Sequence, residues 1–513
     1  MLARCLSASL QGLEARPVTV EVDLAPGLPG VQLVGLPDKA IQESRERVRS
    51  ALRNSGFRGP LVRVVINLAP ADERKEGPSF DLPIALALLV ASGQLDAPLL
   101  DGLWCAGELG LDGRLRPCRG VIAIAELAAR KGAKALLVPP DNAIEAALIP
   151  TLTVRTAQGL RELVDELQQR RPGLAVSPAS QPAKAISGNS PDLPDSETGS
   201  QALALAAAGG HHLLLVGPPG CGKTRLAQSL PRLLPPLESN EALTVTKIHS
   251  VAGMLSQPAD LQRQRPFRAP HHRCTAAALL GGGLHPMPGE LSLAHAGVLF
   301  LDEMAEFPRS VLDQLRQPLE EGQIRLSTAR RRATFPCSIT LVAATNPCPC
   351  GWHGDSRHAC RCTESQRRRY WQRLSGPLLD RIDLQLRLER PTARCIRATI
   401  ASEPATNSGS RWISANRIES ARERMRKRNP KGCSNRQLSA KQLGDRGGFQ
   451  PESLRLWEHI VEKRSLSTRS GLQLLRVART IADLDQMETV PDEAIAQASF
   501  FRCADLLIPA SSY

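Results

Sequence analysis

Hydrophobic and polar positions divide the chain into three patterned regions and one polar stretch. Over residues 1–168, apolar runs such as "PVTVEVDL", "VRVVINL" and "ALLVP" alternate with helical patterns such as "DKAIQESRERVRSALRNSG" and "DLPIALALLVASGQL". This alternation predicts a compact α/β domain. Residues 169–199 are rich in Pro, Ser and Ala and have too few apolar residues to pack, so we expect a linker there.

The second half of the chain has two different patterns. Over residues 200–390, helical and strand patterns alternate, which predicts a parallel sheet with crossover helices. Residues 391–513 are mostly helical in pattern, with segments such as "SANRIESARERMRKRN" and "STRSGLQLLRVARTIADL". The expected fold class is therefore α/β and multidomain, with a helical C-terminal domain.

A glycine-rich loop directly follows one of the apolar strand patterns, in "HHLLLVGPPGCGKTRLA" at residues 211–227. In a loop of the form GxxxxGKT, backbone N–H groups surround the β-phosphate of a nucleotide, and the following helix adds a favourable field. We expect Lys223 to reach the β- and γ-phosphates and Thr224 to bind magnesium. The predicted ATP contacts are Gly217, Pro218, Pro219, Gly220, Cys221, Gly222, Lys223, Thr224 and Arg225.

Two further strand patterns end in polar residues. "GVLFLDEMAEF" places Asp302 and Glu303 after four apolar residues, and "SITLVAATN" ends at Asn346. The carboxyl ends of parallel strands are where α/β proteins bind ligands. We expect Asp302 to hold magnesium, Glu303 to deprotonate the attacking water and Asn346 to orient that water.

The order of these parts, P-loop, acidic strand and Asn strand, resembles that of the AAA+ ATPases. In that family, a segment like "SGPLLDRIDL" (375–384) carries an arginine finger, so Arg381 is expected to reach the γ-phosphate bound by a neighbouring subunit. The lid segment "STRSGLQLLRVARTIADL" resembles the helix that carries the second sensor. Arg469 is the candidate for this role and Arg476 is the alternative.

Longer stretches narrow the resemblance to one family. "RPFRAPHHRCTAAALLGGGLHPMPGELSLAHAGVLFLDE", "NPCPCGWHGDSRHACRC" and "INLAPADERKEGPSFDLPIAL" are similar to the magnesium-chelatase-like ATPases of the YifB/ComM type. The similarity extends over nearly the whole chain. It implies a Lon-protease-like N-terminal domain, an AAA+ core of the magnesium-chelatase and MCM-like branch, and a helical lid. It also implies a hexameric ring that moves along DNA, and ComM members are associated with ATP-driven branch migration during natural transformation.

The Lon-like resemblance does not extend to protease activity. "KEGPSFDLPIAL" (75–86) resembles the Lon segment with the nucleophilic serine, and Ser79 stands at that position. In the later segment "GELGLDGRLRPCRGVIAIAELAARKGAKALLVPPDN", the position of the catalytic lysine falls on Ile122. Because an isoleucine cannot accept a proton, we expect no proteolysis. The domain is instead interpreted as a platform for assembly or DNA handling.

The charge of the chain favours a polyanionic partner. The formal net charge is +14, and "STARRRA" lies between two alternating runs that predict a β-hairpin with a basic tip. MCM-like ATPases place such a hairpin in the pore of the ring, so Arg330, Arg331 and Arg332 are expected to contact DNA phosphates without reading sequence. Weaker candidates lie in the segment before the acidic strand, where related ATPases have a second pore loop: Arg268, His271, His272 and Arg273.

Four of the 13 cysteines follow Asn346 closely, at positions 348, 350, 360 and 362. Four thiolates at this spacing can close a tetrahedral zinc site, and His353 or His358 could replace one ligand. Disulfides are the alternative. The loop joins Asn346 to the segment that carries Arg381. We hypothesise that a structural zinc ion keeps that segment in place, and that its ligands are Cys348, Cys350, Cys360 and Cys362.

Two other functions stay open on the sequence alone. One is a protein-remodelling AAA+ ATPase with a client bound by residues 1–168, and the other is a magnesium-chelatase subunit. The basic hairpin and the few aromatic residues favour backbone binding of DNA. No apolar run reaches the roughly 18 residues of a membrane span, and no secretory signal pattern is present. We therefore expect a cytoplasmic protein with reduced thiols.

Overall fold

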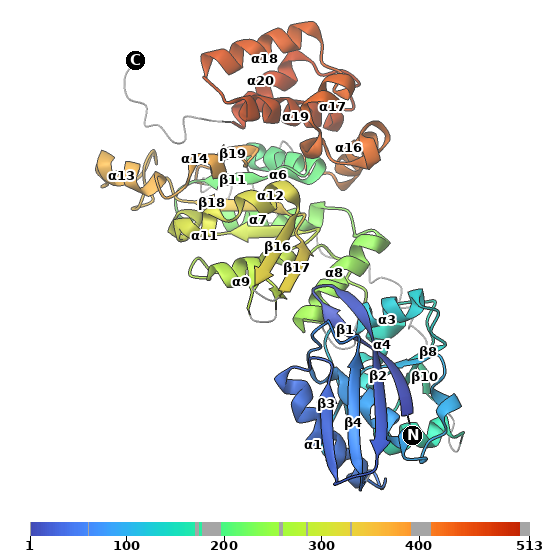
Figure 1. Ribbon diagram of the computed structural model, residues 1–513. Helices are drawn as coiled ribbons and strands as arrows, with labels where there is room; N and C mark the ends of the chain where they lie inside the picture. The colour runs from blue at the N-terminus through green and yellow to red at the C-terminus, as the bar shows by residue number, and fades with distance from the viewer. Residues whose placement is uncertain are drawn as a thin grey trace, which may run out of the picture.

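The computed structural model describes residues 2–59, 61–169, 174–176, 196–255, 260–283, 286–328, 331–390 and 412–502. Figure 1 shows three parts in a row: a blue and cyan N-terminal domain, a green and yellow central domain and a red helical domain. The mixed α/β architecture with a helical C-terminal region confirms the expected fold class.

The N-terminal domain is built on an eight-stranded mixed sheet, with strand order β10-β9-β8-β5-β1-β2-β4-β3. The first strand was not predicted, although its burial alternates, and it pairs antiparallel with the second along its whole length. The strands are β1 (Leu2–Gln11), β2 (Glu14–Ala25), β3 (Gly30–Val34), β4 (Arg63–Ala69), β5 (Leu103–Cys105), β8 (Ala135–Val138), β9 (Val154–Thr156) and β10 (Leu174–Val176), with a small hairpin of β6 (Glu108–Leu109) and β7 (Leu115–Arg116).

The described residues of this domain form the helices α1 (Lys39–Asn54), α2 (Asp81–Ala91), α3 (Val121–Arg130), α4 (Pro140–Ala147) and α5 (Leu160–Leu167). Every residue of α2 is buried, because its apolar sequence has no polar face to turn toward water. Strand β10 lies inside the range expected to be a linker, where it pairs with β9 at the edge of the sheet.

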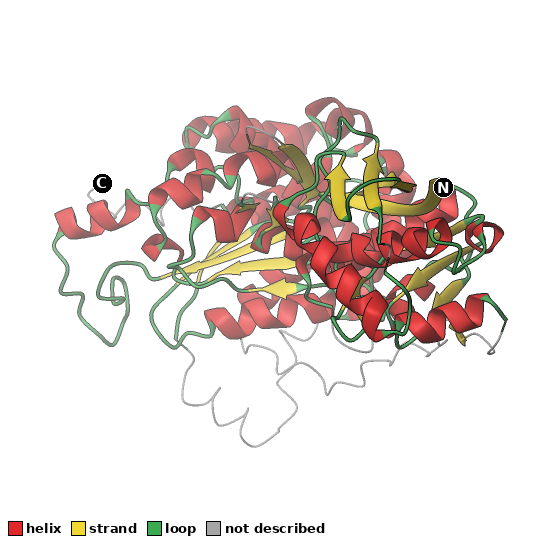
Figure 2. Ribbon diagram, turned by 60° about the horizontal axis from the view of Figure 1, so that its bottom comes forward, coloured by secondary structure: helices red, strands yellow, loops and turns green. Residues whose placement is uncertain are grey.

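The central domain contains the parallel sheet that the alternating pattern predicted, with strand order β12-β15-β18-β11-β19. Its strands are β12 (Phe267–Arg268), β15 (Val298–Leu301), β18 (Thr340–Thr345), β11 (Leu213–Val216) and β19 (Leu384–Arg387). All residues of β11, β15 and β18 are buried, which matches their continuous apolar sequences. Helices lie on both faces of this sheet (Figure 2).

The helices of the central domain are α6 (Glu197–Gly209), α7 (Lys223–Leu233), α8 (Ser239–Ala252), α9 (Ala276–Leu280), α10 (Glu290–Leu293), α11 (Arg309–Asp313), α12 (Arg316–Glu321), α13 (Glu364–Trp371) and α14 (Gly376–Leu379). Two hairpins are inserted between β12 and β18. They are the short pair β13 (Gly281–Gly282) and β14 (Met287–Pro288), and the longer pair β16 (Gln323–Thr328) and β17 (Arg331–Pro336). The longer pair confirms the hairpin predicted around "STARRRA".

The C-terminal domain consists of α16 (Ala415–Arg428), α17 (Ala440–Arg446), α18 (Pro451–Lys463), α19 (Thr468–Leu484) and α20 (Asp492–Phe500). Its central helix, α19, is buried over most of its length, and the alanine-rich α6 shares one hydrophobic cluster with it. This packing joins the lid to the central domain. Within the described part of the chain, no helix has the length and apolar character needed to cross a membrane.

The N-terminal domain contacts the central domain through α8. Leu13, in the turn between β1 and β2, shares a hydrophobic cluster with Ile248 and Val251 of α8 and with Ala333 and Phe335 of β17. The first domain therefore packs directly against the base of the basic hairpin.

Candidate active site

The loop between β11 and α7 has the conformation that its glycines allow. Gly220 and Gly222 have φ values of +76° and +88°, a region that side chains with a Cβ rarely adopt. A Cβ on Gly217 would lie 2.7 Å from the carbonyl oxygen of Leu388. The three glycines thus let the loop curl tightly against the sheet, as a phosphate-binding loop requires.

Lys223 points back into this loop. Its Nζ donates hydrogen bonds to the carbonyl oxygens of Gly217 (2.7 Å) and Pro218 (3.0 Å), and to Oδ1 of Asn346 (3.2 Å). Burial lowers the pKa of Lys223, and Cys221 and Asp302 act in the opposite direction. The P-loop lysine and the asparagine at the end of β18 therefore meet.

The magnesium candidates also converge. Thr224 Oγ1 donates to Asp302 Oδ2 over 3.3 Å, so the hydroxyl and the carboxylate expected to bind the metal are neighbours. Oxygen ligands of this kind suit Mg²⁺, which binds proteins through one or two such groups together with substrate phosphates. The residues present therefore fit a magnesium ion, and a bound ion would neutralise phosphate charge there.

Glu303 has an unusual backbone and a partner that the sequence did not reveal. Its φ of +51° lies in the left-handed region, which costs energy for a residue with a side chain. Its Oε2 lies 3.2 Å from Nδ1 of His272, which belongs to the loop between β12 and α9. A histidine considered for DNA contact thus touches the expected catalytic carboxylate. No local motif signals this contact, because the two residues are far apart in sequence.

A cleft of about 490 Å³ unites these groups, and its lining residues are Pro219, Gly220, Cys221, Gly222, Lys223, Thr224, Arg225, Asp302, Glu303, Thr345 and Asn346. These come from three neighbouring strand ends of one parallel sheet. The lining residues include neither Arg381 nor Arg469. Arg381 follows α14 of the central domain, and Arg469 lies on α19 of the C-terminal domain.

Arg381 and Arg469 converge on one carboxylate, that of Glu320 at the end of α12. Arg381 Nη2 lies 2.9 Å from Glu320 Oε1, and Nη1 of Arg469 pairs with the same oxygen. Burial alone would raise the pKa of Glu320, but the hydrogen bonds from Arg469 and Arg381 outweigh it and lower that pKa. The sequence pointed to both arginines but not to their common partner. The alternative sensor, Arg476, instead donates to the carbonyl oxygen of Leu438.

The DNA candidates have different surroundings. Arg332 is exposed on β17, whereas Arg330 and the side chain of Arg331 lie outside the described residues. Arg268 makes a two-pronged ion pair with Glu290, at 2.6 and 2.7 Å. Its guanidinium is therefore paired with a carboxylate of its own chain, and its contact with DNA stays a prediction.

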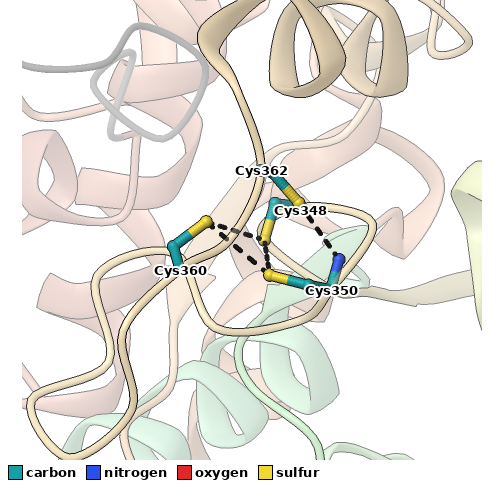
Figure 3. Close-up of side chains that lie close together, drawn as sticks. All are labelled: Cys348, Cys350, Cys360 and Cys362. Carbon is teal, nitrogen blue, oxygen red and sulfur yellow. Dashed lines mark hydrogen bonds between the residues drawn. The ribbon is translucent and has the colours of Figure 1, made fainter.

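The four cysteines of the loop after β18 lie together (Figure 3). Their sulfur atoms are all within 4.8 Å of one another, with Cys348–Cys350 at 3.4 Å and Cys348–Cys360 at 3.7 Å. A tetrahedral zinc ion with Zn–S bonds near 2.3 Å requires sulfurs roughly 3.8 Å apart, so the arrangement fits zinc. Burial raises the pKa of the Cys350 thiol, but backbone hydrogen bonds from Trp352 and Arg361 outweigh it and lower that pKa to about 6, whereas burial raises the pKa of Cys348 to about 12.

This cysteine loop touches the phosphate-binding loop. A Cβ on Gly351 would lie 2.9 Å from Cδ of Pro219, and Gly351 has a φ of +83°. Trp371 also donates from Nε1 to the carbonyl oxygen of Pro347, over 3.1 Å. The loop thus lies between the ATP site and the segment leading to Arg381.

The Lon-like positions lie apart from the nucleotide cleft. Ile122 is fully buried in α3, and its backbone N–H donates to Oε1 of Glu145 over 3.0 Å. Ser79 is half-buried before α2. The apolar side chain at position 122 agrees with the expectation that the dyad is incomplete, and the absence of proteolysis stays a prediction.

Together, the parallel sheet, the P-loop, the acidic strand end and the attached helical lid define a AAA+-type P-loop protein. The chain matches three family descriptions: "Magnesium chelatase, subunit ChlI" over residues 191–395, "Subunit ChlI of Mg-chelatase" over 20–142, and "Magnesium chelatase, subunit ChlI C-terminal" over 410–502. It belongs to the magnesium-chelatase-like AAA+ family of the YifB/ComM type.

Individual relatives support this membership over nearly the full length. "Uncharacterized protein YifB" of Escherichia coli K12 is 43% identical over 97% of this chain and 96% of its own length. "Competence protein ComM" of Haemophilus influenzae is 40% identical over 98% of this chain and 97% of its own length. A "Lon protease" of Protochlamydia amoebophila is 40% identical over 15% of this chain and 9% of its own length, which agrees with a Lon-like portion.

Proposed function

We propose that the chain hydrolyses ATP as a ring-shaped hexamer that moves DNA, with branch migration during recombination or natural transformation as its reaction. The observation that carries this proposal is the basic hairpin β16–β17, which is inserted between the acidic strand β15 and the Asn strand β18 of the ATP site. The similarity to a competence protein supports a DNA-related task. Arg330, Arg331 and Arg332 are the proposed phosphate contacts.

In the proposed reaction, each residue of the cleft has one task. Lys223 and the backbone of residues 217–224 hold the phosphates, while Thr224 and Asp302 hold magnesium. Glu303 accepts a proton from the attacking water, which Asn346 orients. Arg381 and Arg469 lie outside the cleft of their own chain, so we assign their charge to the ATP bound by the adjacent subunit.

We also propose that Cys348, Cys350, Cys360 and Cys362 hold a structural zinc ion. The support is that the four sulfurs all lie within 4.8 Å of one another. Such an ion would fix a loop that contacts Pro219 on one side and leads to Arg381 on the other. We place the protein in the cytoplasm, where these thiols stay reduced.

The decisive experiment measures ATPase rate with and without single-stranded, duplex and four-way-junction DNA, at two salt concentrations. DNA should stimulate hydrolysis, and the effect should weaken with salt because phosphate contacts release counterions. Arg332→Ala should weaken DNA binding and reduce the salt slope by about 1. Arg4→Ala, an exposed arginine of the N-terminal domain paired with Glu21, is the matched control.

Hydrolysis that no DNA stimulates would contradict the motor proposal. In that case, the alternative is a protein-remodelling ATPase, and clients of residues 1–168 should be sought.

A further inference from the structure

We infer that Glu320 is a positioning residue, which holds Arg381 and Arg469 together and links them to the basic hairpin. This inference rests on the proposed function, in which both arginines serve the ATP of a neighbouring subunit.

Glu320 brings two cations to one point. Arg381 and Arg469 come from different domains, one beside α14 and the other on the lid helix α19, yet both pair with Oε1 of Glu320. Two guanidinium groups this close repel each other unless an anion lies between them. Without the carboxylate, both side chains would move apart, and the lid would lose one of its ties to α12.

The two arginines are held to different degrees. Arg381 is only 15% exposed, and it also donates to the carbonyl oxygens of Arg316 (3.1 Å) and Pro377 (2.6 Å). Arg469 is 40% exposed. The guanidinium of Arg381 is therefore fixed in place and that of Arg469 is more accessible, although both pair with the carboxylate of Glu320. This is the arrangement that a neighbour's γ-phosphate could engage.

Helix α12 connects this pair to the hairpin directly. Glu321 ends the helix, Gly322 follows it with a φ of +65°, and β16 begins at Gln323. The backbone N–H of Cys337, which follows β17, donates to the carbonyl oxygen of Gly322 over 2.8 Å. Both ends of the hairpin thus meet at Gly322, which is only two positions after Glu320 in the sequence. A movement of the hairpin on DNA would shift α12 and with it the two arginines.

The test compares kcat and KM for ATP among the wild type, Glu320→Gln and Glu320→Asp, with and without DNA. Gln keeps the shape of Glu without its charge, whereas Asp keeps the charge on a shorter side chain. A positioning carboxylate predicts that kcat falls about 10-fold to 100-fold in Glu320→Gln and is partly restored in Glu320→Asp, while KM stays unchanged and both variants stay folded. The control is Glu321→Gln, which removes an exposed pair with Arg325 and should leave kcat unchanged.

Four outcomes would contradict the inference or a part of it. A wild-type kcat in Glu320→Gln, or a slower rate for Glu320→Asp than for Glu320→Gln, would overturn the positioning role. If Glu320→Gln lowers the ATPase rate by the same factor with and without DNA, the proposed link between Glu320 and the hairpin is wrong. A wild type that no DNA stimulates would defeat the proposed motor function and the link together, while the basal rates would still decide the positioning role.

Discussion

At the residue scale, the strongest assignment is Glu303, which lies at the cleft beside Asp302 and is exposed enough to meet a water molecule. We expect Glu303→Gln to bind ATP with unchanged affinity and to lower kcat at least about 100-fold, because the amide cannot accept the proton of the attacking water. The measurements are steady-state ATPase rate and the binding of a fluorescent ATP analogue.

Glu306→Gln is the matched control for Glu303→Gln. Glu306 follows three residues later and pairs with Arg373 over 2.7 Å at the surface, so its charge contributes little. We expect a near-normal rate in this variant. Equal losses in the two variants would mean that Glu303 has no special chemical role.

The sequence pattern was enough to locate some residues of the cleft but not all of their contacts. Lys223, Thr224, Asp302 and Asn346 could be predicted because each stands at a fixed offset from a strand or helix end, and parallel strands bring such ends to one edge. The contact of His272 with Glu303 could not be predicted, since it depends on how the segment before α9 folds over the sheet. A side-chain contact between distant segments leaves no local period in the sequence.

At the element scale, the loop with Gly351 links the proposed zinc site to the P-loop. We expect the purified protein to contain one zinc ion per chain, measured by atomic spectroscopy, and Cys360→Ser to lose most of it. Loss of zinc should weaken ATP binding, because a loose loop no longer supports Pro219. Cys433→Ser, which changes a cysteine of the lid domain, should keep both the zinc and the affinity.

If the zinc-free protein binds and hydrolyses ATP normally, the proposed structural role of the metal is wrong. A second check on the same contact is Gly351→Ala. This substitution forces a Cβ against Pro219 at a positive φ, and it should weaken ATP binding even with zinc in place.

Elements were predicted unevenly for a physical reason. The core strands β11, β15 and β18 and the lid helix α19 have strong apolar patterns and were found where expected. Strand β1 was missed because its pattern is weak, and its position is fixed by pairing with β2 rather than by its own composition. The meeting of Arg381 and Arg469 at Glu320 was missed because the angle between the lid and the central domain is a tertiary property.

At the scale of the whole molecule, the N-terminal domain is coupled to the ATPase core through charged and polar contacts on α8. Lys247 pairs with Glu126 of α3, and Ser250 donates to Glu145 of α4, whose pKa is raised by burial. Together with the packing of Leu13 against Ala333, these contacts hold the N-terminal domain against β17 of the hairpin. The N-terminal domain would thus shape the hairpin that we propose to bind DNA, even if it lacks protease activity as predicted.

This arrangement predicts the effect of reversing one interface charge. Lys247→Glu should place two carboxylates together and cost roughly 1–3 kcal/mol of docking free energy, since both groups are mostly shielded from solvent. Hydrogen exchange should increase in α3 and α8, and DNA should stimulate the ATPase less, because the hairpin loses its support. The double variant Lys247→Glu/Glu126→Lys should restore both properties, whereas Lys131→Glu, an exposed change beside α3, should alter neither. If the double variant behaves like the single one, the ion pair does not hold the domains together, and the hydrogen bond from Ser250 to Glu145 and the apolar contact of Leu13 would have to do so.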